Sequence, residues 1–277
     1  MHYVGLSRVR NSSALHILNL NENKIKVSEK VKSEMSRLRT KASLMPLAVL
    51  QLPDSPQTKT ILFQNVRSLN LHIEDVRSDY NIQKADLNIF VETKLCSLDK
   101  DDKFKLTGFI LYRNDFNHSN IRTCYGTAVY IKNDLNCTKI PYRFNVNNVE
   151  ITVTVLSVPL PNIHVVGIYR SKIVKISLLI EALTYLHKSV LKSPTIPTIL
   201  LGDFNINLMQ ECAEQKALKA FLITNKGYIQ LINQYTTDYR TQIDHIYTNI
   251  PQLVQSAGTL ESYYSDHKPI LISLKAA

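Results

Sequence analysis

Several apolar runs in this sequence stop at a polar side chain that could bind a metal ion or move a proton. The stretch TILLGDFNINL, residues 198–208, is the clearest, because an apolar run leads directly into Asp203 and Asn205. Strands of α/β enzymes end in this way when they carry catalytic groups to the edge of a sheet. Other apolar runs stop at Asn65, Glu92, Tyr169, Asp244 and the pair Asp266 and His267.

Each strand end taken singly is weak evidence, because an Asp at such a position is most often a turn residue. Together the residues form the set that hydrolysis of a phosphodiester needs. A hard cation such as Mg²⁺ prefers carboxylate oxygens, which makes Glu92, helped by Asn65 and Asp266, a candidate metal platform. Softer ligands are absent from this set, so a magnesium-type site is the prediction.

The remaining residues fit the handling of an attacking water. Hydrolysis requires an oriented water, a group that takes its proton, and positive charge near the phosphate oxygens. Asp203, Asn205 and His267 are the candidates for these roles. Asp244 would hold His267 in one tautomer and favour its charged form. Tyr169 is a candidate donor to the phosphate, although a tyrosine on a strand packs in a core at least as often.

The elements that must position these residues are short apolar strands separated by helices. This mixture of βα units and hairpins predicts two packed mixed sheets with helices outside, rather than a purely parallel sheet. The two-residue period of a strand turns His245 away from Asp244, so His245 is left out of the site. We predict strands over 60–66, 87–93, 109–114, 127–132, 150–158, 164–170, 198–204, 228–232, 243–248 and 269–275, and helices over 71–85, 176–190 and 218–227.

Composition bounds the class of protein. The chain has 277 residues, 44% of them hydrophobic, which is enough for one large core. No apolar run reaches the length of a membrane span and no apolar segment follows the charged N-terminus, so neither a span nor a signal peptide is expected. An intracellular protein is the prediction. The cysteines lack CxxC spacing, which predicts reduced thiols rather than a zinc site: Cys96, Cys124, Cys137 and Cys212.

The net charge of +10 favours a polyanionic partner such as nucleic acid. Ten Lys and Arg face four Asp and Glu within residues 1–60, so most of the excess lies there. A solvated basic tail is the alternative interpretation of this charge.

The order QN, ET, GIYR, GDFN, IDHIYTN, SDHKPI resembles the endonuclease/exonuclease/phosphatase superfamily, and the resemblance covers residues 59–275. It implies a four-layer α/β sandwich with a Mg²⁺ or Mn²⁺ ion at Glu92 and Asn65. It also implies that Asp203 and Asn205 place the attacking water. In the same pattern Asp244 pairs with His267, Asp266 sits in the metal or phosphate shell, and Tyr169 reaches the scissile phosphate.

Two departures from that pattern bear on the substrate. The family tyrosine is followed here by Arg-Ser-Lys, residues 170–172, where DNA-cleaving relatives often have a Pro-Asn continuation. The chain also has no Trp, whereas abasic-site specialists of this fold line the sugar pocket with a bulky aromatic. Strict abasic-site specificity is therefore not expected.

The N-terminal phrase YVGLSRVRNSSALHIL is similar to the last motif of transposon and telomere-associated DNA helicases. By that resemblance Arg8 would be a vestigial arginine finger, because the chain has no phosphate-binding GxxxxGK[ST] loop. The Pro-containing stretch after it reads as a linker. We predict a helicase remnant over 1–39, a linker over 40–58 and the endonuclease-like domain over 59–277.

A helicase C-terminus joined to such a domain resembles Helitron-type transposons that carry an appended endonuclease. The leading expectation is therefore a divalent-metal-dependent DNA endonuclease of a transposable element, acting in the nucleus. Two alternatives stay open: a phosphatase or phosphodiesterase with a non-DNA substrate, and an inactive remnant that binds DNA. The oligomeric state is not readable from the sequence.

Overall fold

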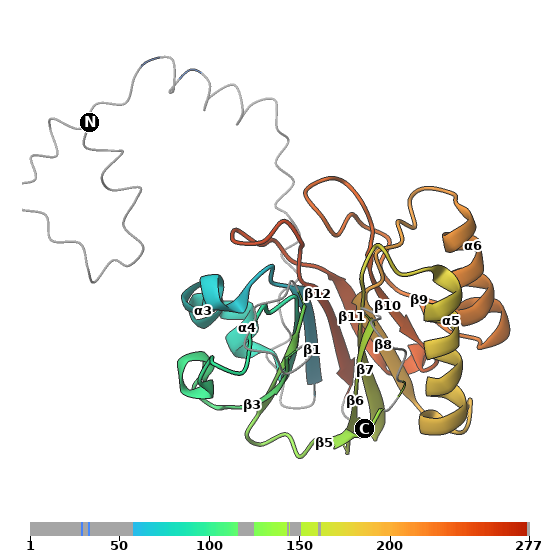
Figure 1. Cartoon of the computed structure of the whole chain (residues 1–277), viewed down its shortest axis with the longest axis horizontal. Helices are drawn as coiled ribbons and strands as arrows, with labels where there is room; N and C mark the ends of the chain where they lie inside the picture. Colours follow the sequence, from blue (N-terminus) through green and yellow to red (C-terminus); the bar gives the residue numbers. More distant parts are fainter. Residues whose placement is uncertain are drawn as a thin grey trace, which may run out of the picture. The chain divides into compact units, whose positions relative to one another are not determined.

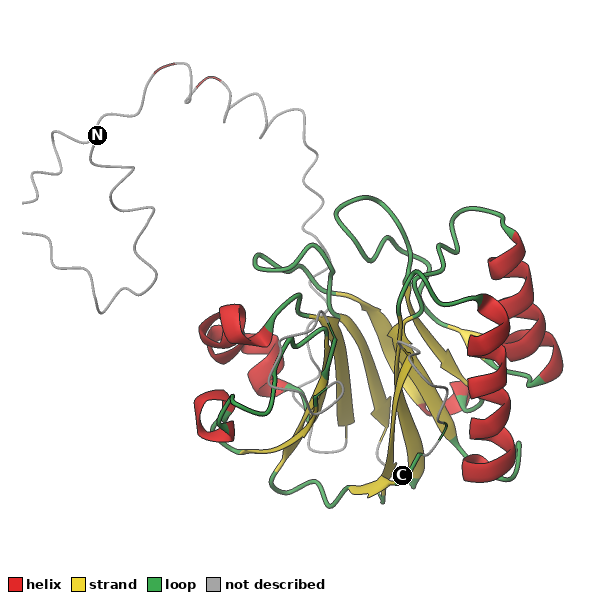
Figure 2. Cartoon of the chain, in the orientation of Figure 1, coloured by secondary structure: helices red, strands yellow, loops and turns green. Residues whose placement is uncertain are grey.

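The strands form two six-stranded sheets that pack face to face (Figures 1 and 2). This computed structural model describes residues 29, 33, 58–115, 125–142, 144, 151–159 and 162–275. In order across the first sheet, the strands are β11 (Val254–Thr259), β12 (Ile270–Lys275), β1 (Thr58–Asn65), β2 (Leu87–Val91), β4 (Thr127–Lys132) and β3 (Phe109–Asn114). In order across the second sheet, they are β5 (Thr138–Ile140), β6 (Ile151–Val158), β7 (Ile163–Arg170), β8 (Thr198–Asp203), β10 (Asp244–Thr248) and β9 (Ile229–Gln230).

Both sheets are mixed. Strands β1 and β2 are parallel, as are β7 and β8, and the other described neighbours are antiparallel. A parallel pair needs a crossover, and the helices supply it: α3 (Leu69–Ser78) and α4 (Tyr80–Lys84) join β1 to β2, and α5 (Ile176–Tyr185) joins β7 to β8. The predicted pair of mixed sheets flanked by helices is confirmed.

Three apolar cores correspond to the interfaces of the four layers. One lies between the sheets and contains Ile61 and Ile89 of the first sheet with Val165 and Leu201 of the second. Another joins the outer face of the first sheet to α3 and α4, and a third joins the outer face of the second sheet to the helices around α5. Figure 1 shows these helices on opposite outer faces of the pair of sheets.

The sheets approach closely at Gly167 of β7. A Cβ atom there would lie 2.9 Å from Cγ2 of Ile89 on β2, which is too close for any side chain. Glycine at this position therefore allows the close approach of the two strands.

The helix predicted over 71–85 is wrong in one respect, since it is two helices. Asp79 is extended, with φ −74° and ψ 114°, and its carboxylate accepts hydrogen bonds from the backbone N–H groups of Asn81 and Ile82. An Asp that caps a new helix ends the previous one, and the apolar period continues across the break. Sequence periodicity alone does not reveal it.

The helix predicted over 176–190 is found, and the one predicted over 218–227 is found but begins earlier, at Ala213. Helix α5 continues as a π-helical segment, Leu186–Leu191, and α6 (Ala213–Lys219) continues in the same way over Ala220–Asn225 up to the turn at Gly227. Short 3₁₀ turns occur at Asp101–Phe104 and Pro251–Leu253. No helix among the described residues is both long and apolar enough to cross a membrane.

Two strands were not predicted, β5 and β11. Strand β5 has only three residues, and its side chains are exposed or half-buried. Strand β11 reads VQSAGT, lies at an edge and has a register irregularity between Val254 and Ser256. Edge strands with polar residues lack the apolar alternation that marks a strand in a sequence.

The predicted segments 1–39 and 40–58 lie almost wholly outside the described residues, and Arg8 lies outside them too. All strands of the described residues belong to one unit of the chain, Leu50–Ala277. The domain boundaries stay a prediction.

Candidate active site

Four of the predicted site residues extend the inner faces of their strands. Side chains of a strand alternate between faces, so Asn65 follows the inward Phe63, and Asp203 follows the inward Leu201. Tyr169 belongs to the same inter-sheet core. Asp244 lies opposite Asp203 in the antiparallel pairing of β10 with β8. The polar residues therefore meet where the apolar inter-sheet core ends.

Glu92 reaches the same place by breaking the alternation. Val91 faces the inter-sheet core, so a regular strand would turn Glu92 to the helix side with Phe90. Glu92 instead has a left-handed backbone, with φ 51°. Its Oε1 accepts a hydrogen bond from Nδ2 of Asn65 at 2.8 Å and one from the hydroxyl of Tyr169 at 3.2 Å. Positive φ costs a non-glycine residue about 1 kcal/mol, and such strain concentrates at functional sites.

Asn65 links the two halves of the site. Its Nδ2 donates to Glu92 and also to Oδ2 of Asp203, at 3.1 Å, so the first sheet contacts the second through one amide. Its Oδ1 accepts the backbone N–H of Arg67 at 3.1 Å. Asn65 is fully buried, and all its polar atoms have partners, which fixes its orientation.

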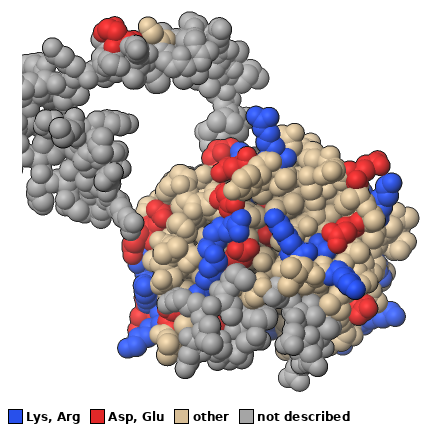
Figure 3. Space-filling model, turned by 45° about the horizontal axis from the view of Figure 1, so that its top comes forward, with Lys and Arg blue, Asp and Glu red and all other residues tan. Residues whose placement is uncertain are grey.

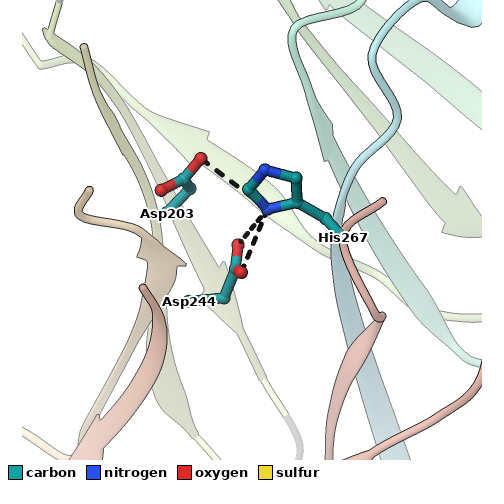
Figure 4. A group of neighbouring side chains, drawn as sticks. All are labelled: Asp203, Asp244 and His267. Carbon is teal, nitrogen blue, oxygen red and sulfur yellow. Dashed lines mark hydrogen bonds and ion pairs between the residues drawn. The ribbon is translucent and has the colours of Figure 1, made fainter. Parts of the chain in front are cut away.

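His267 lies between two acids (Figure 4). Its Nδ1 is 3.2 and 3.1 Å from the two carboxylate oxygens of Asp244, and 4.0 Å from Oδ2 of Asp203. All three residues are buried, with 1% exposure for each acid and 4% for the histidine. A proton on Nδ1 satisfies Asp244 and leaves Nε2 to interact with a substrate.

Burial and charge shape the protonation of this cluster. Burial lowers the pKa of His267, but the charge and hydrogen bond of Asp244, followed by the charge of Asp203, outweigh it and raise that pKa to about 9. Burial, followed by the charge of Asp244, raises the pKa of Asp203 well above its usual range. Neighbouring buried groups titrate as a unit. This site therefore favours the protonated form of His267 and disfavours the ionised form of Asp203.

Asn205 lies two residues beyond the end of β8. Its backbone is left-handed, with φ 50°, and its N–H donates to Oδ1 of Asp203 at 3.0 Å. Its Nδ2 donates to the carbonyl of Arg170 at 2.7 Å. Asn205 is therefore held by the tips of both β7 and β8.

Arg170 holds this strand tip in place, although we did not predict it as a site residue. Its side chain is 1% exposed and donates to the carbonyls of Val174, Phe204 and Asn205. It also pairs with Glu214 of α6 at 2.6 Å. The sequence carried one weak signal, the position of this Arg directly after Tyr169.

Arg67 is the second residue that sequence reasoning missed. Its guanidinium donates to both carboxylate oxygens of Asp266 at 2.8 Å, and its Nη1 lies 3.6 Å from Oε2 of Glu92. This bidentate pair lowers the pKa of Asp266, chiefly through the hydrogen bond from Arg67. The structure thus pairs Asp266 with Arg67, which also lies near Glu92.

The site opens into a pocket of about 270 Å³ whose walls combine acids and bases. Figure 3 shows Lys and Arg side chains next to Asp and Glu on the face turned forward. The pocket is lined by Arg67, Glu92, Lys94, Tyr125, Tyr169, Ser171, Lys172, Asp203, Asn205 and His267. The basic side chains in this lining, Arg67, Lys94 and Lys172, suit a phosphate group.

The residues present fit a divalent cation. Glu92 presents a nearly buried carboxylate to the pocket; the amide N–H of Asn65 donates to that carboxylate, and its amide oxygen accepts the N–H of Arg67. A second set of donors, Asp203, Asp244 and His267, has ligand atoms within 4.8 Å of one another. Carboxylate and amide oxygens match a hard cation such as Mg²⁺. The raised basicity of His267 and its contact with Asp244 favour the first set over the second.

His245 lies on the other face of β10, as predicted. Its ring stacks on Phe204 with centroids 5.0 Å apart, and Nε2 lies 2.9 Å from the carbonyl of Ile206. Burial lowers its pKa to about 4. His245 is therefore a neutral core residue that packs against Phe204 and contacts Ile206, just beyond the end of β8. Among the described cysteines, Cys96, Cys137 and Cys212 are free thiols, as expected.

Comparison with solved structures gives the fold a family context. The endonuclease domain of TRAS1, a telomere-specific non-LTR retrotransposon, superposes with a TM-score of 0.62 at 17% identity, over 79% of this chain and 99% of that chain. A 3′ phosphatase from Neisseria, solved with a product DNA hairpin, gives 0.58 at 18% identity, over 78% and 99%. A mannosyl-6-phosphatase from Bacteroides thetaiotaomicron gives 0.55 at 14%, over 77% and 98%.

These neighbours include endonuclease/exonuclease/phosphatase domains, and the likeness shows that this chain shares their fold. No protein-family model matches the sequence. No curated protein matches it either.

Proposed function

We propose that this protein is a divalent-metal-dependent phosphodiesterase that acts as a DNA endonuclease. The observation that carries the proposal is the convergence of a buried Asp244–His267 pair, Asp203 and a Glu92–Asn65 pair on one polar pocket. General acid–base groups, an oxygen-ligand platform and rim cations are the parts that phosphodiester hydrolysis requires.

The roles follow from the contacts. Asp244 holds the imidazole of His267 so that a charged Nε2–H is directed toward a phosphate oxygen. Asp203 is surrounded by hydrogen-bond donors and has a raised pKa, which suits a group that orients water and takes its proton. Tyr169 lines the pocket; its hydroxyl donates to Glu92 and would have to turn away from it to donate to the phosphate.

Glu92, with the amide oxygen of Asn65, would hold the cation. A Mg²⁺ or Mn²⁺ ion bound there would withdraw negative charge from the phosphate and orient the oxygen that leaves or attacks. Glu92 is suited to this role because its carboxylate lines the pocket and its Oε1 is already oriented by Asn65 and Tyr169.

DNA is the substrate that the surroundings favour. The pocket carries Arg67, Lys94 and Lys172 at its rim, and a polyanion gains from several such contacts. Two fold neighbours support the choice, the TRAS1 endonuclease domain and the phosphatase solved with a DNA hairpin. The transposon origin, the Helitron-type helicase remnant and action in the nucleus remain part of the proposal and rest on the sequence resemblance.

A phosphatase acting on a phosphorylated sugar is the second candidate, favoured by the small volume of the pocket and by the mannosyl-6-phosphatase fold neighbour. An inactive chain that only binds DNA is the third.

Nicking of supercoiled plasmid by the full chain separates these candidates. Reactions contain Mg²⁺, Mn²⁺ or EDTA, with Asp203→Asn as the test variant and Asp134→Asn, an exposed acid in the turn after β4, as the matched control. Metal-dependent nicking that is lost only in Asp203→Asn supports an endonuclease. Release of phosphate from sugar phosphates without nicking would identify the second candidate, and DNA binding without either reaction would identify the third.

A further inference from the structure

Arg67 is held rigidly at the mouth of the pocket. Its backbone is left-handed, with φ 56°, and its N–H donates to Oδ1 of Asn65. The next residue, Ser68, caps α3 by accepting the N–H of Leu71. Arg67 therefore lies between the end of β1 and the start of α3, and these two elements fix the position of its backbone.

The side chain of Arg67 is equally constrained. Its Nε and Nη2 donate to the two oxygens of Asp266 at 2.8 Å each, a bidentate geometry that fixes the plane of the guanidinium. A guanidinium has five N–H groups, so this pair leaves one on Nη2 and both on Nη1. The Nη1 edge faces Glu92 at 3.6 Å, longer than a hydrogen bond, and the side chain is 43% exposed.

A phosphate that enters this pocket needs a cation beside its oxygens, because carboxylates crowd the site. Glu92, Asp203 and the His267–Asp244 pair meet in or behind the pocket, and a phosphate that enters it adds further negative charge. Arg67 is the cation nearest Glu92 among the contacts of the described residues. An arginine anchored by one carboxylate and open on its other edge is suited to bind phosphate oxygens.

We propose that Arg67 binds a non-bridging oxygen of the scissile phosphate through Nη1, and that Asp266 positions Arg67 rather than binding the metal ion. This inference deepens the proposed function and rests on it. In this arrangement Asp266 acts on the phosphate indirectly, by orienting Arg67.

The test uses the full chain with Arg67→Met, Arg67→Lys, Asp266→Asn and the double variant Arg67→Met/Asp266→Asn. Arg77→Met is the matched control, since Arg77 lies on α3 and does not line the pocket. Circular dichroism checks the folding of each variant. Arg67→Lys keeps the charge without the bidentate geometry, so it remains informative if the methionine variant does not fold.

Binding of duplex DNA is measured first, by fluorescence anisotropy in EDTA, so that neither the metal ion nor turnover contributes. Loss of one charged phosphate contact should weaken binding about tenfold in Arg67→Met and reduce the slope of log K against log salt by about one. Arg77→Met should bind like the wild type. Wild-type affinity and slope in Arg67→Met would overturn the proposal.

Cleavage tests the role of Asp266. We expect kcat/KM to fall about a hundredfold in Arg67→Met and by a similar factor in Asp266→Asn, with no further loss in the double variant, because the pair acts as a unit. The Mg²⁺ concentration for half-maximal activity should stay unchanged in Asp266→Asn. A tenfold rise in that concentration would show that Asp266 binds metal and would overturn its assignment.

Failure of the proposed function gives a different pattern. In that case the wild type cleaves no DNA at any metal concentration, while the anisotropy measurement in EDTA still reports whether Arg67 contacts phosphate.

Discussion

Nδ1 of His267 lies 3.1 Å from Oδ2 of Asp244; Asp244 is on β10 of the second sheet, and His267 lies just before β12 of the first sheet. Both side chains are buried, so the attraction between the imidazolium and the carboxylate is weakly screened by water. This contact explains why the pKa of the imidazole is raised despite its burial. It also fixes which ring nitrogen faces the pocket.

Replacing Asp244 by Asn should lower turnover about a thousandfold. The amide keeps the shape of the side chain but removes the charge that favours the imidazolium, and it can stabilise the wrong tautomer. Turnover is measured under single-turnover conditions on the best nicking substrate. Asp238→Asn, on the exposed turn before β10, is the control, and equal activity of Asp244→Asn and wild type would contradict the pairing.

Replacing Glu92 by Gln should weaken binding of the metal ion. The variant loses the carboxylate charge but can keep the contacts with Asn65 and Tyr169, so the fold should survive. We expect the Mg²⁺ concentration for half-maximal activity to rise at least tenfold. Calorimetric titration of Mn²⁺ into the protein checks binding without turnover. Glu211→Gln, at an exposed acid before α6, should titrate like wild type.

The buried Arg170 should contribute strongly to stability. In Arg170→Met the carbonyls of Val174, Phe204 and Asn205 lose a donor, and we expect the free energy of unfolding to fall by about 3 kcal/mol. Glu214→Gln should cost about 1 kcal/mol or less, because the Glu214 side chain is 40% exposed to water. Urea unfolding measures both. Equal losses in the two variants would show that the ion pair, and not the backbone contacts, dominates.

His245 should make the fold sensitive to acid. Its pKa is about 4 in the folded chain, below the value near 6.5 of an unfolded one, so the unfolded state binds more protons between these values. The contribution of His245 to the free energy of unfolding is therefore fully present above pH 6.5 and falls as the pH drops toward 4. Between pH 7 and 5 this group alone should lower the free energy of unfolding by about 2 kcal/mol.

Urea unfolding of wild type and His245→Gln at pH 7 and pH 5 isolates this contribution. The glutamine keeps a donor for the carbonyl of Ile206 but does not titrate. The free energy of unfolding of His245→Gln should therefore fall by about 2 kcal/mol less than that of the wild type between pH 7 and pH 5. Parallel losses in the two proteins would show that His245 is not the group responsible.

Much of this architecture was predictable because it depends on short-range patterns. The continuous apolar runs in TILFQN and TILLGDF predict buried strands that end near Asn65 and Asp203, and both strands are found. An apolar run that stops at a polar residue can be read without the fold. The edge strands β5 and β11 were missed because their side chains are mostly exposed or half-buried, and no apolar pattern is required of them.

By itself, the sequence determined the fold class and the residue types that gather at one end of the sheets, because burial periodicity and strand-end chemistry are local. Only the tertiary structure decided how those residues pair. Glu92 turns inward through a positive φ that no pattern announces, and Asp266 contacts Arg67 across 199 residues of chain. Arg170 joins the tips of β7 and β8 from the buried side. Such contacts depend on side-chain direction and distance in three dimensions, which residue spacing does not encode.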